Sequence, residues 1–591
     1  YAFNEAVRAG GDTRDEILGV LSLVFWTLTA VVSIKYLVFV LHADNKGEGG
    51  TLAMFSQLSS KIRSGKKGIL GFTVFLFLMA AAMEFSDGIL TPAISVISAV
   101  EGIKTINPEL EYLVVPITVL ILAVLFTFQF KGTHNLGKVF GPVMIIWFIT
   151  LSVIGIYQIV QNPESLVALN PMYAANFVVA HGFQTLFVMA SVILAVTGAE
   201  ALFADLGHFG RGPIRIGWFG LAGIALPLSY FGQGALLLRD PSKIGNSFFG
   251  MVPAGLPALM LLLITTLATI IASQALISAV ASLASQASQL GLLPRLRIKH
   301  TNHEERGQIF VPFVNTIVGI GSITLVIVFG SSSALAGAYS FAIAFTMLVS
   351  TIGLILLAVS KWKRARFVLL PIFGVFLLLD LSLFTASATK LITGAWLPLL
   401  AGFCLASMMW IWRKGRFELD KRLSETSMSW SQVTRLRKGG KVVITDNVGI
   451  YPSAVPGLVP QALEQQIRVL GSMPKEILVV TVESMDTPYC HKPPVYQKIN
   501  EYLASVTVPS GFMEQRNVPR ALRSHSVSEH FDERDAIYFV TDRTLIPADK
   551  TGLNKAEELI FTTLHRNATT PAHYYHLPEC RVITFDISIE V

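Results

Sequence analysis

The sequence carries little charge. Only 14% of its 591 residues are Asp, Glu, Lys or Arg, and 52% are hydrophobic, whereas soluble globular proteins carry roughly 25% charged residues. Residues 413–591 nevertheless hold 22 Lys and Arg and 21 Asp and Glu, which is about half of all the charge in the chain. This distribution argues against a soluble enzyme and against disorder. It predicts two domains, a lipid-embedded part at 1–412 and a water-exposed part at 413–591.

Cysteine is scarce as well. Cys404, Cys490 and Cys580 are too few and too scattered for a disulfide framework or a four-ligand metal site. The formal net charge is +7, and nearly all of this surplus lies in the apolar part, where basic residues mark cytoplasmic loops rather than contacts to nucleic acid. We therefore expect neither a cofactor nor a nucleic-acid partner.

The apolar part is rich in runs long enough to cross a bilayer, which takes about 20 residues as a helix. Eleven such runs predict an all-α polytopic membrane protein, with spans near 17–41, 68–100, 112–130, 140–160, 181–206, 214–238, 252–285, 310–330, 333–359, 367–388 and 394–412.

Basic residues in the loops predict how these spans are oriented. Loops of one side hold 17 Lys and Arg, those of the other side hold six, and Lys35 lies inside a span. By the positive-inside rule, the side with 17 is cytoplasmic. The tail then lies in the cytoplasm and Tyr1 outside. We expect about 12 membrane helices in all, with the first one truncated to its outer tip at 1–7.

The tail alternates short β-rich runs with helical patterns. Strands are predicted at 441–445, 477–482, 536–540 and 582–585, and helices at 460–470 and 553–566. This alternation is typical of a small α/β or α+β domain.

Five carboxylates fall within or at the ends of apolar spans. Inserting one charged side chain at the middle of a membrane helix costs on the order of 3 kcal/mol of free energy. The five carboxylates are those of Glu84, Asp87, Glu200, Asp205 and Asp380.

Asp87 and Thr91 share a helix face because they are four residues apart, and Pro92 leaves the carbonyl of Gly88 without its helical donor. This grouping of oxygens favours a hard-cation site. Glu200 follows Thr197-Gly198-Ala199 in mid-span, where a transport helix can unwind and expose carbonyl oxygens.

Structural interpretations stand beside these functional ones. Lys35 could snorkel or pair with Asp87 or Glu200. Asp205 is expected in a solvated ion-pair cluster with Arg211 and Arg215. Glu84 could form a coupled acid pair with Asp87 or face lipid or water. For Asp380 a structural role is favoured.

Several long motifs carry a family resemblance. They are ADNKGEGG at 43–50, DGILTPAISV at 87–96, TGAEALFADLGHFG at 197–210 and YFGQGALL at 230–237. In their order and spacing they resemble the KUP (HAK/KUP/KT) family of potassium uptake transporters. The resemblance spans essentially the whole membrane part.

This resemblance implies a LeuT-like inverted-repeat fold of the APC superfamily and symport of K⁺ with H⁺ across the cell membrane. It implies that Asp87 and Thr91 bind potassium, that Thr197 adds an oxygen, that Tyr1 and Tyr339 line the path, and that Glu200 binds the coupled proton.

The same resemblance implies a homodimer and a regulatory nucleotide on the tail, as in bacterial relatives. The sequence departs from the family pattern at Glu84-Phe85-Ser86, where an aromatic residue followed by Tyr-Gly is usual. Two alternatives stay open. One is an amino-acid or other solute transporter on the same fold, and the other is a sensor that does not transport.

Overall fold

The computed structural model describes nearly the whole chain. Its descriptions cover residues 1–591 except 59, 64–67, 132–133, 301–308, 363, 392–393, 395, 454–456, 534–535, 547–551 and 591.

The chain divides into two compact units. Unit 1 comprises Tyr1–Ala284 and Ile298–Ala406, and unit 2 comprises Ser285–Arg297 and Ser407–Val591. Unit 2 therefore includes a short segment from the middle of the sequence in addition to the tail.

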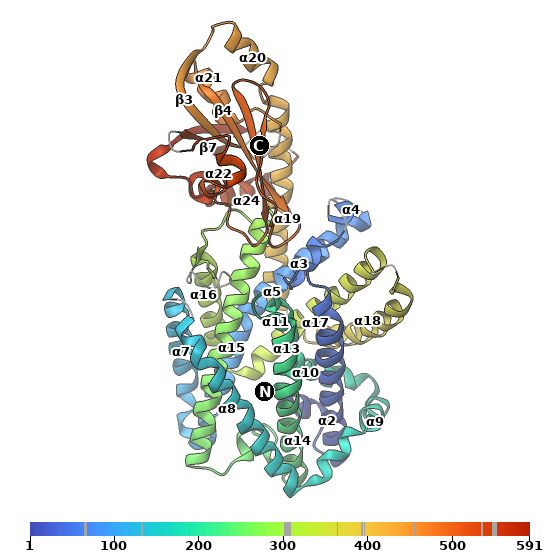
Figure 1. Cartoon of the computed structure of the whole chain (residues 1–591). Helices are drawn as coiled ribbons and strands as arrows, with labels where there is room; N and C mark the ends of the chain where they lie inside the picture. Colours follow the sequence, from blue (N-terminus) through green and yellow to red (C-terminus); the bar gives the residue numbers. More distant parts are fainter. Residues whose placement is uncertain are drawn as a thin grey trace. The chain divides into compact units, whose positions relative to one another are not determined.

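Long apolar helices dominate the first part of the chain (Figure 1). Within the described residues, eleven segments are long and apolar enough to cross a membrane, which confirms the eleven predicted spans. Their main elements are α2 (Arg14–Leu28) with η1 (Thr29–Phe39), α5 (Gly68–Val100), α7 (Val114–Phe128), α8 (His134–Gln161), α9 (Met172–His181) with α10 (Thr185–Val192), α13 (Arg211–Gly217) with α14 (Gly223–Arg239), α15 (Leu256–Gln289), α16 (Pro312–Phe329), α17 (Ser332–Ser360), α18 (Arg366–Ala388) and α19 (Trp396–Thr426).

Several of these spans depart from regular α-helix, and two of the departures lie where the sequence places polar groups. The span that contains Thr197 is broken into α10, a 3₁₀ stretch at η7 (Ile193–Val196) and α11 (Gly198–Ala204). The segment η1, which contains Lys35, is π-helical. π-helical turns are uncommon and are frequent at functional sites, and a stretch of 3₁₀ helix inside a longer helix often marks a hinge. The two departures lie near each other, because Tyr36 of η1 is hydrogen-bonded to Glu200 of α11.

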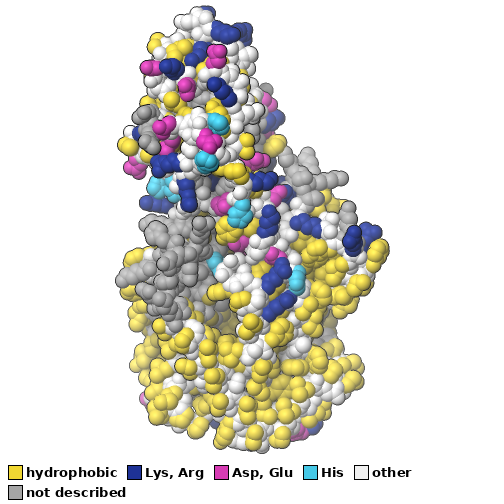
Figure 2. Space-filling view, in the orientation of Figure 1, with side chains coloured by type: hydrophobic (Ala, Val, Ile, Leu, Met, Phe, Trp, Pro, Cys, Tyr) yellow, Lys and Arg dark blue, Asp and Glu magenta, His cyan; other side chains and the backbone are white. Residues whose placement is uncertain are grey.

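The surface of unit 1 suits a hydrocarbon solvent. Hydrophobic side chains cover most of its visible face (Figure 2). On α8, Ile145, Ile149, Val153 and Ile156 are each about half exposed, and their helical spacing makes one continuous stripe. In water such a stripe would be an interaction site, whereas in a bilayer it faces lipid.

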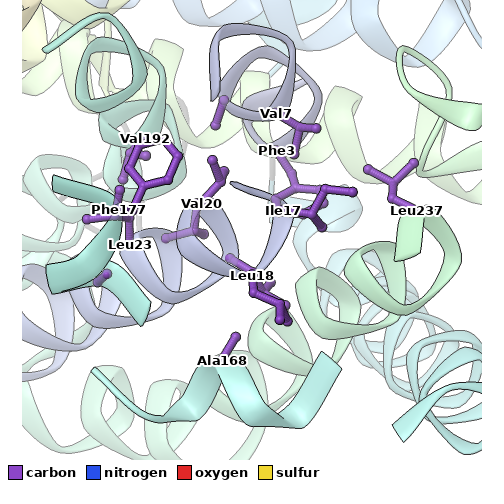
Figure 3. Packing of buried hydrophobic residues seen from close by; sticks show 14 of the residues in the cluster. Phe3, Val7, Ile17, Leu18, Val20, Leu23, Ala168, Phe177, Val192 and Leu237 are labelled. Atoms are coloured by element: carbon purple, nitrogen blue, oxygen red, sulfur yellow. The ribbon is translucent and has the colours of Figure 1, made fainter. Parts of the chain in front are cut away.

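A buried apolar cluster holds the start of the chain in unit 1. Phe3 and Val7 of α1 (Ala2–Gly10) pack with Ile17 and Val20 of α2 and with Phe177 of α9 (Figure 3). This packing fixes α1, and with it Tyr1, which immediately precedes the helix.

Unit 2 is built on a six-stranded sheet with the order β5-β6-β4-β3-β7-β8. The strands are β3 (Val443–Ser453), β4 (Ser472–Met485), β5 (Val495–Lys498), β6 (Leu503–Gly511), β7 (Ala536–Ile546) and β8 (Val582–Glu590). All neighbouring pairs are parallel except β5 with β6.

Helices cover both faces of this sheet, because neighbouring residues of a strand point to opposite sides. Tyr451 of β3 packs with α20 (Trp430–Lys438) and α21 (Gln461–Leu470), whereas Ile450 packs with α22 (Val518–Leu522). The helix α24 (Lys555–Arg566) belongs to a further apolar cluster with α19. The tail is therefore α/β, and the four predicted strands and two predicted helices are present. The sequence did not predict β5 and β6.

Close contact between α8 and α14 depends on two glycines. A Cβ atom added to Gly232 would lie 2.6 Å from the Cα atom of Gly155, and one added to Gly155 would lie 2.3 Å from the carbonyl oxygen of Leu228. Neither distance leaves room for a methyl group, so the backbones approach each other as in other small-residue interfaces of membrane helices.

We expect Gly232→Ala to lower the free energy of unfolding by about 1–3 kcal/mol, because the added methyl group overpacks the interface. Thermal unfolding of the purified protein in detergent measures this. Gly220→Ala is the matched control, because an added Cβ there meets no atom within 4 Å. Equal unfolding temperatures for the two variants would contradict the interpretation.

Candidate functional site

Asp87 and Thr91 lie on one face of α5, as their spacing predicts. The Thr91 hydroxyl is hydrogen-bonded to Asp87 Oδ1 at 2.5 Å and to the Tyr339 hydroxyl of α17 at 2.8 Å. Asp87 is 7% exposed and Tyr339 is 3% exposed. Two helices therefore place a carboxylate and two hydroxyl groups together away from bulk water.

Thr197 brings the remaining predicted residues to the same place. Its side chain interacts with the phenol groups of both Tyr1 and Tyr339, and Tyr339 also interacts electrostatically with Asp87. The Thr197 hydroxyl donates to the carbonyl oxygen of Leu194 at 3.2 Å, just where the helix is broken. All five residues that the resemblance assigns to potassium are thus connected by these interactions in one cluster.

A cavity of about 650 Å³ opens beside this cluster in unit 1. Tyr1 lines it, and so do Ser95 and Ser98 of α5. Ser98, Ser95, Thr91 and Asp87 follow one another at helical spacing. Hydroxyl side chains therefore follow one face of α5 between the cavity and Asp87. Lys104, which also lines the cavity, belongs to a loop that was predicted to lie outside.

The loop 43–50 packs tightly against neighbouring helices of unit 1. A Cβ atom at Gly49 would lie 1.8 Å from the carbonyl oxygen of Phe203, and one at Gly207 would lie 2.1 Å from the Glu48 carboxylate. Asn45 holds the loop by donating to Ser56 at 2.8 Å, and Arg211 forms an ion pair with Asp44. The glycines of the motif allow this loop to lie directly against α11 and α12 (Leu206–Phe209).

Glu200 of α11 is buried, and only one of its two carboxyl oxygens has a hydrogen-bond partner among the described residues. Its Oε1 atom accepts hydrogen bonds from Tyr36 of η1 and, at 3.2 Å, from Ser350 of α17. Its Oε2 atom is buried and has no hydrogen-bond partner in the described part of the chain. Tyr36 and Ser350 were not predicted, because both lie far from Glu200 in sequence.

Lys35 is fully buried and pairs with Asp380, so both alternatives considered for it, snorkelling and a partner at Asp87 or Glu200, were wrong. The Nζ atom lies 2.7 Å from Asp380 Oδ2 and 3.0 Å from the carbonyl oxygen of Met347, and Thr351 donates to the same Oδ2 atom at 2.5 Å. Both charged side chains are fully buried. Asp380 lies well inside α18, eight residues before its end at Ala388, which is why an ammonium group inside η1 can reach it.

The expected ion-pair cluster around Asp205 is also wrong. Arg211 pairs with Asp44, and Arg215 donates to the carbonyl oxygen of Leu37. The two arginines that were expected to pair with Asp205 thus bind elsewhere, Arg211 to the loop 43–50 and Arg215 to the end of η1.

Glu84 lies one helical turn from Asp87 on α5 and accepts a hydrogen bond from Thr51 of α3 (Thr51–Ser56). It also interacts electrostatically with Glu200 and Asp87. The acid that departs from the usual family pattern is therefore close to both predicted site carboxylates.

Comparisons with known proteins agree along the whole chain. A family model described as the K⁺ potassium transporter integral membrane domain matches residues 1–417, and one described as the K⁺ potassium transporter C-terminal domain matches residues 446–591.

Similar proteins are known from several bacteria. A probable potassium transport system protein Kup 2 of Paramagnetospirillum magneticum is 40% identical over 587 residues, which cover 98% of this chain and 90% of that protein. A probable potassium transport system protein Kup of Methylococcus capsulatus is 40% identical over 583 residues, covering 98% and 93%. A protein of the same name from an Acidovorax species is 36% identical, covering 100% and 96%.

We expect Lys35→Met and Asp380→Asn each to lower the free energy of unfolding by about 3–5 kcal/mol, because each leaves a polar or charged partner buried without its counterpart. The double variant should recover most of this loss. Thermal unfolding of the four proteins measures the coupling. If the loss of stability in the double variant equalled the sum of the losses in the two single variants, Lys35 and Asp380 would not stabilise this region as a pair.

Proposed function

Because this chain belongs to the K⁺ potassium transporter (Kup) family, a family of integral membrane transporters and not of enzymes, we propose that it imports K⁺ in symport with H⁺. The observation that carries the proposal is the convergence of Asp87, Thr91, Thr197, Tyr339 and Tyr1 next to the outer cavity. We assign K⁺ binding to this cluster and proton binding to Glu200.

The chemistry of the cluster suits a potassium ion. A dehydrated K⁺ ion needs several oxygen ligands, and binding must stay weak enough for release. Asp87 supplies the one carboxylate of the cluster, while Thr91, Thr197 and the two tyrosines supply neutral hydroxyl oxygens. One negative charge can balance one K⁺ ion without holding it too tightly.

The backbone supports the proposed LeuT-like fold at one point in particular. The span with Thr197 is interrupted at η7 next to the cluster, and interrupted helices near the membrane centre supply ion ligands in carriers of that fold. A transporter for an amino acid fits less well, because Asp87 and Glu200 would repel the carboxylate of the substrate.

Glu200 has the surroundings of a proton carrier. Tyr36 and Ser350 hold one carboxyl oxygen, while Oε2 has no partner among the described residues. An ionised carboxylate with an unpartnered oxygen is costly in a water-poor site, and protonation removes the charge. We propose that Glu200 is protonated in the loaded carrier and releases its proton to the cytoplasm to reset the cycle.

The driving force follows from charge movement. Each positive charge that enters the cell gains about 2.3 kcal/mol per 100 mV of membrane potential. Co-transport of a proton doubles the transferred charge and adds any pH gradient. Dimerisation and nucleotide control, which the resemblance implies, stay predictions.

We expect Asp87→Asn to abolish potassium uptake, because it removes the charge of an ion ligand and keeps its volume. Uptake of rubidium by proteoliposomes that hold the purified protein, with and without a proton ionophore, measures the activity. Asp12→Asn is the matched control, since Asp12 is exposed. If the Asp87→Asn protein took up rubidium at the rate of the parent, the assignment of Asp87 as an ion ligand would be refuted. If the parent bound rubidium but did not transport it, a sensor would be favoured over a transporter.

We expect Glu200→Gln to keep rubidium binding and to lose uptake driven by an inward proton gradient, because glutamine mimics the protonated acid permanently. The measurement is rubidium uptake as the outer medium is acidified, with Glu109→Gln as the control for an exposed outer-loop acid. If acidification still stimulated the Glu200→Gln carrier several-fold, as in the parent, Glu200 would be a structural acid.

A further inference from the structure

Two buried carboxylates of unit 1, Glu200 of α11 and Asp380 of α18, are bound to consecutive residues of η1. Tyr36 donates a hydrogen bond to Glu200 Oε1, and Lys35 donates to Asp380 Oδ2 at 2.7 Å. Glu200 is 5% exposed and Asp380 is fully buried. Because adjacent residues of one segment reach both acids, the two carboxylates lie close to each other.

The helix α17 repeats this arrangement. Ser350 donates to Glu200 Oε1 at 3.2 Å, and the next residue, Thr351, donates to Asp380 Oδ2 at 2.5 Å. Glu200 and Asp380 also interact electrostatically. Two separate segments therefore hold the two acids side by side, although α11 and α18 are far apart in the sequence.

Each acid has one oxygen without a donor. Glu200 Oε2 and Asp380 Oδ1 are both buried and have no hydrogen-bond partner in the part of the chain that the structure describes. A buried carboxylate oxygen without a donor is costly, and in native proteins it usually has a functional reason or a bound ion or water. Two such oxygens on neighbouring acids favour a donor that both can use.

The charges of this group differ by one. Lys35 contributes one positive charge, and the two acids contribute two negative charges when both are ionised. Among the described residues, the ion pair of Lys35 with Asp380 is the only one that either acid forms. The other charged groups that interact with Glu200 are Glu84 and Asp87 of α5, which add negative charge. One proton would make the group of Lys35, Asp380 and Glu200 neutral.

We propose that Glu200 and Asp380 share the transported proton, so that the proton site is a pair of acids. This inference rests on the proposed role of Glu200 and adds Asp380 to it. In the loaded carrier the proton is bound to Glu200 Oε2 and is donated in a hydrogen bond to Asp380 Oδ1, directly or through one buried water. Neighbouring carboxyl groups in a buried site titrate as a pair, because a like charge disfavours the ionised form of each.

The ion pair with Lys35 decides which acid carries the proton. Asp380 is the acid that stays ionised, because an ammonium group without its counter-ion would be costly at this depth. Asp380 is therefore the acceptor and Glu200 the donor of the shared hydrogen bond. When the proton leaves for the cytoplasm, Lys35 is the positive charge that remains beside the two carboxylates.

Infrared difference spectroscopy of the full-length protein in liposomes tests this, because the C=O stretching band of a protonated carboxyl group is separate from the bands of carboxylates. Acidification should produce such a band in the parent, and Glu200→Gln should remove it. We expect the parent's band to be broad and shifted to low frequency, because its proton is shared. In the Lys35→Met/Asp380→Asn double variant the band should become narrow and move to higher frequency, since an amide oxygen is a weaker acceptor than a carboxylate.

Rubidium uptake by proteoliposomes gives a second readout, which a purely structural ion pair would not change. The double variant should lose most of the stimulation by outside acidification. Asp380→Glu should keep it, because this change preserves both the carboxylate and the charge pair. Asp12→Asn, at an exposed position, should behave like the parent. Thermal unfolding shows which variants are folded, and the spectrum of the parent does not depend on them.

The two proposals fail in different ways. If Glu200→Gln keeps the stimulation by acid, the proposed role of Glu200 is wrong and the shared proton with it. If Glu200→Gln removes the band and the stimulation, the role of Glu200 is supported. The sharing is then overturned if the parent's band is narrow and lies at the frequency of an isolated acid, or if the folded double variant keeps the parent's band and stimulation.

Discussion

A lysine and an aspartate that are both fully buried hold the centre of unit 1 together. The Lys35–Asp380 ion pair joins η1 to α18, and the bonds to Met347 and Thr351 add α17. Neither charge can be left alone in a low-dielectric interior, so the three segments must stay in register. Because Tyr36 follows Lys35 directly, this pair also fixes the phenol that hydrogen-bonds Glu200. A structural interaction thereby sets the surroundings of the proposed proton carrier.

Local patterns in the sequence predict much of this arrangement. The spans follow from apolar runs of bilayer length, and the Asp87–Thr91 contact follows from helical spacing. The partner of Lys35 could not be predicted, since 345 residues separate it from Asp380, and spacing carries no information about contacts between distant helices. The same reason explains why Arg211 was assigned to the nearby Asp205 rather than to Asp44.

In unit 2, too, the sequence predicts individual strands and helices rather than how they pair. Continuous apolar runs such as Ile477–Val480 indicate buried strands. In β6 the alternation of Ser505 and Thr507 with valines ends at Pro509, which weakens the signal for a strand. The order of the strands depends on which segments pair, which no periodicity encodes.

The close approach of Gly49 to the carbonyl oxygen of Phe203 has a consequence for the motion of this region. The contact is made of backbone against backbone, so rotation of a side chain, which takes picoseconds to nanoseconds, cannot break it. The loop and α11 can separate only when they shift as bodies, on the slower scale of microseconds to milliseconds.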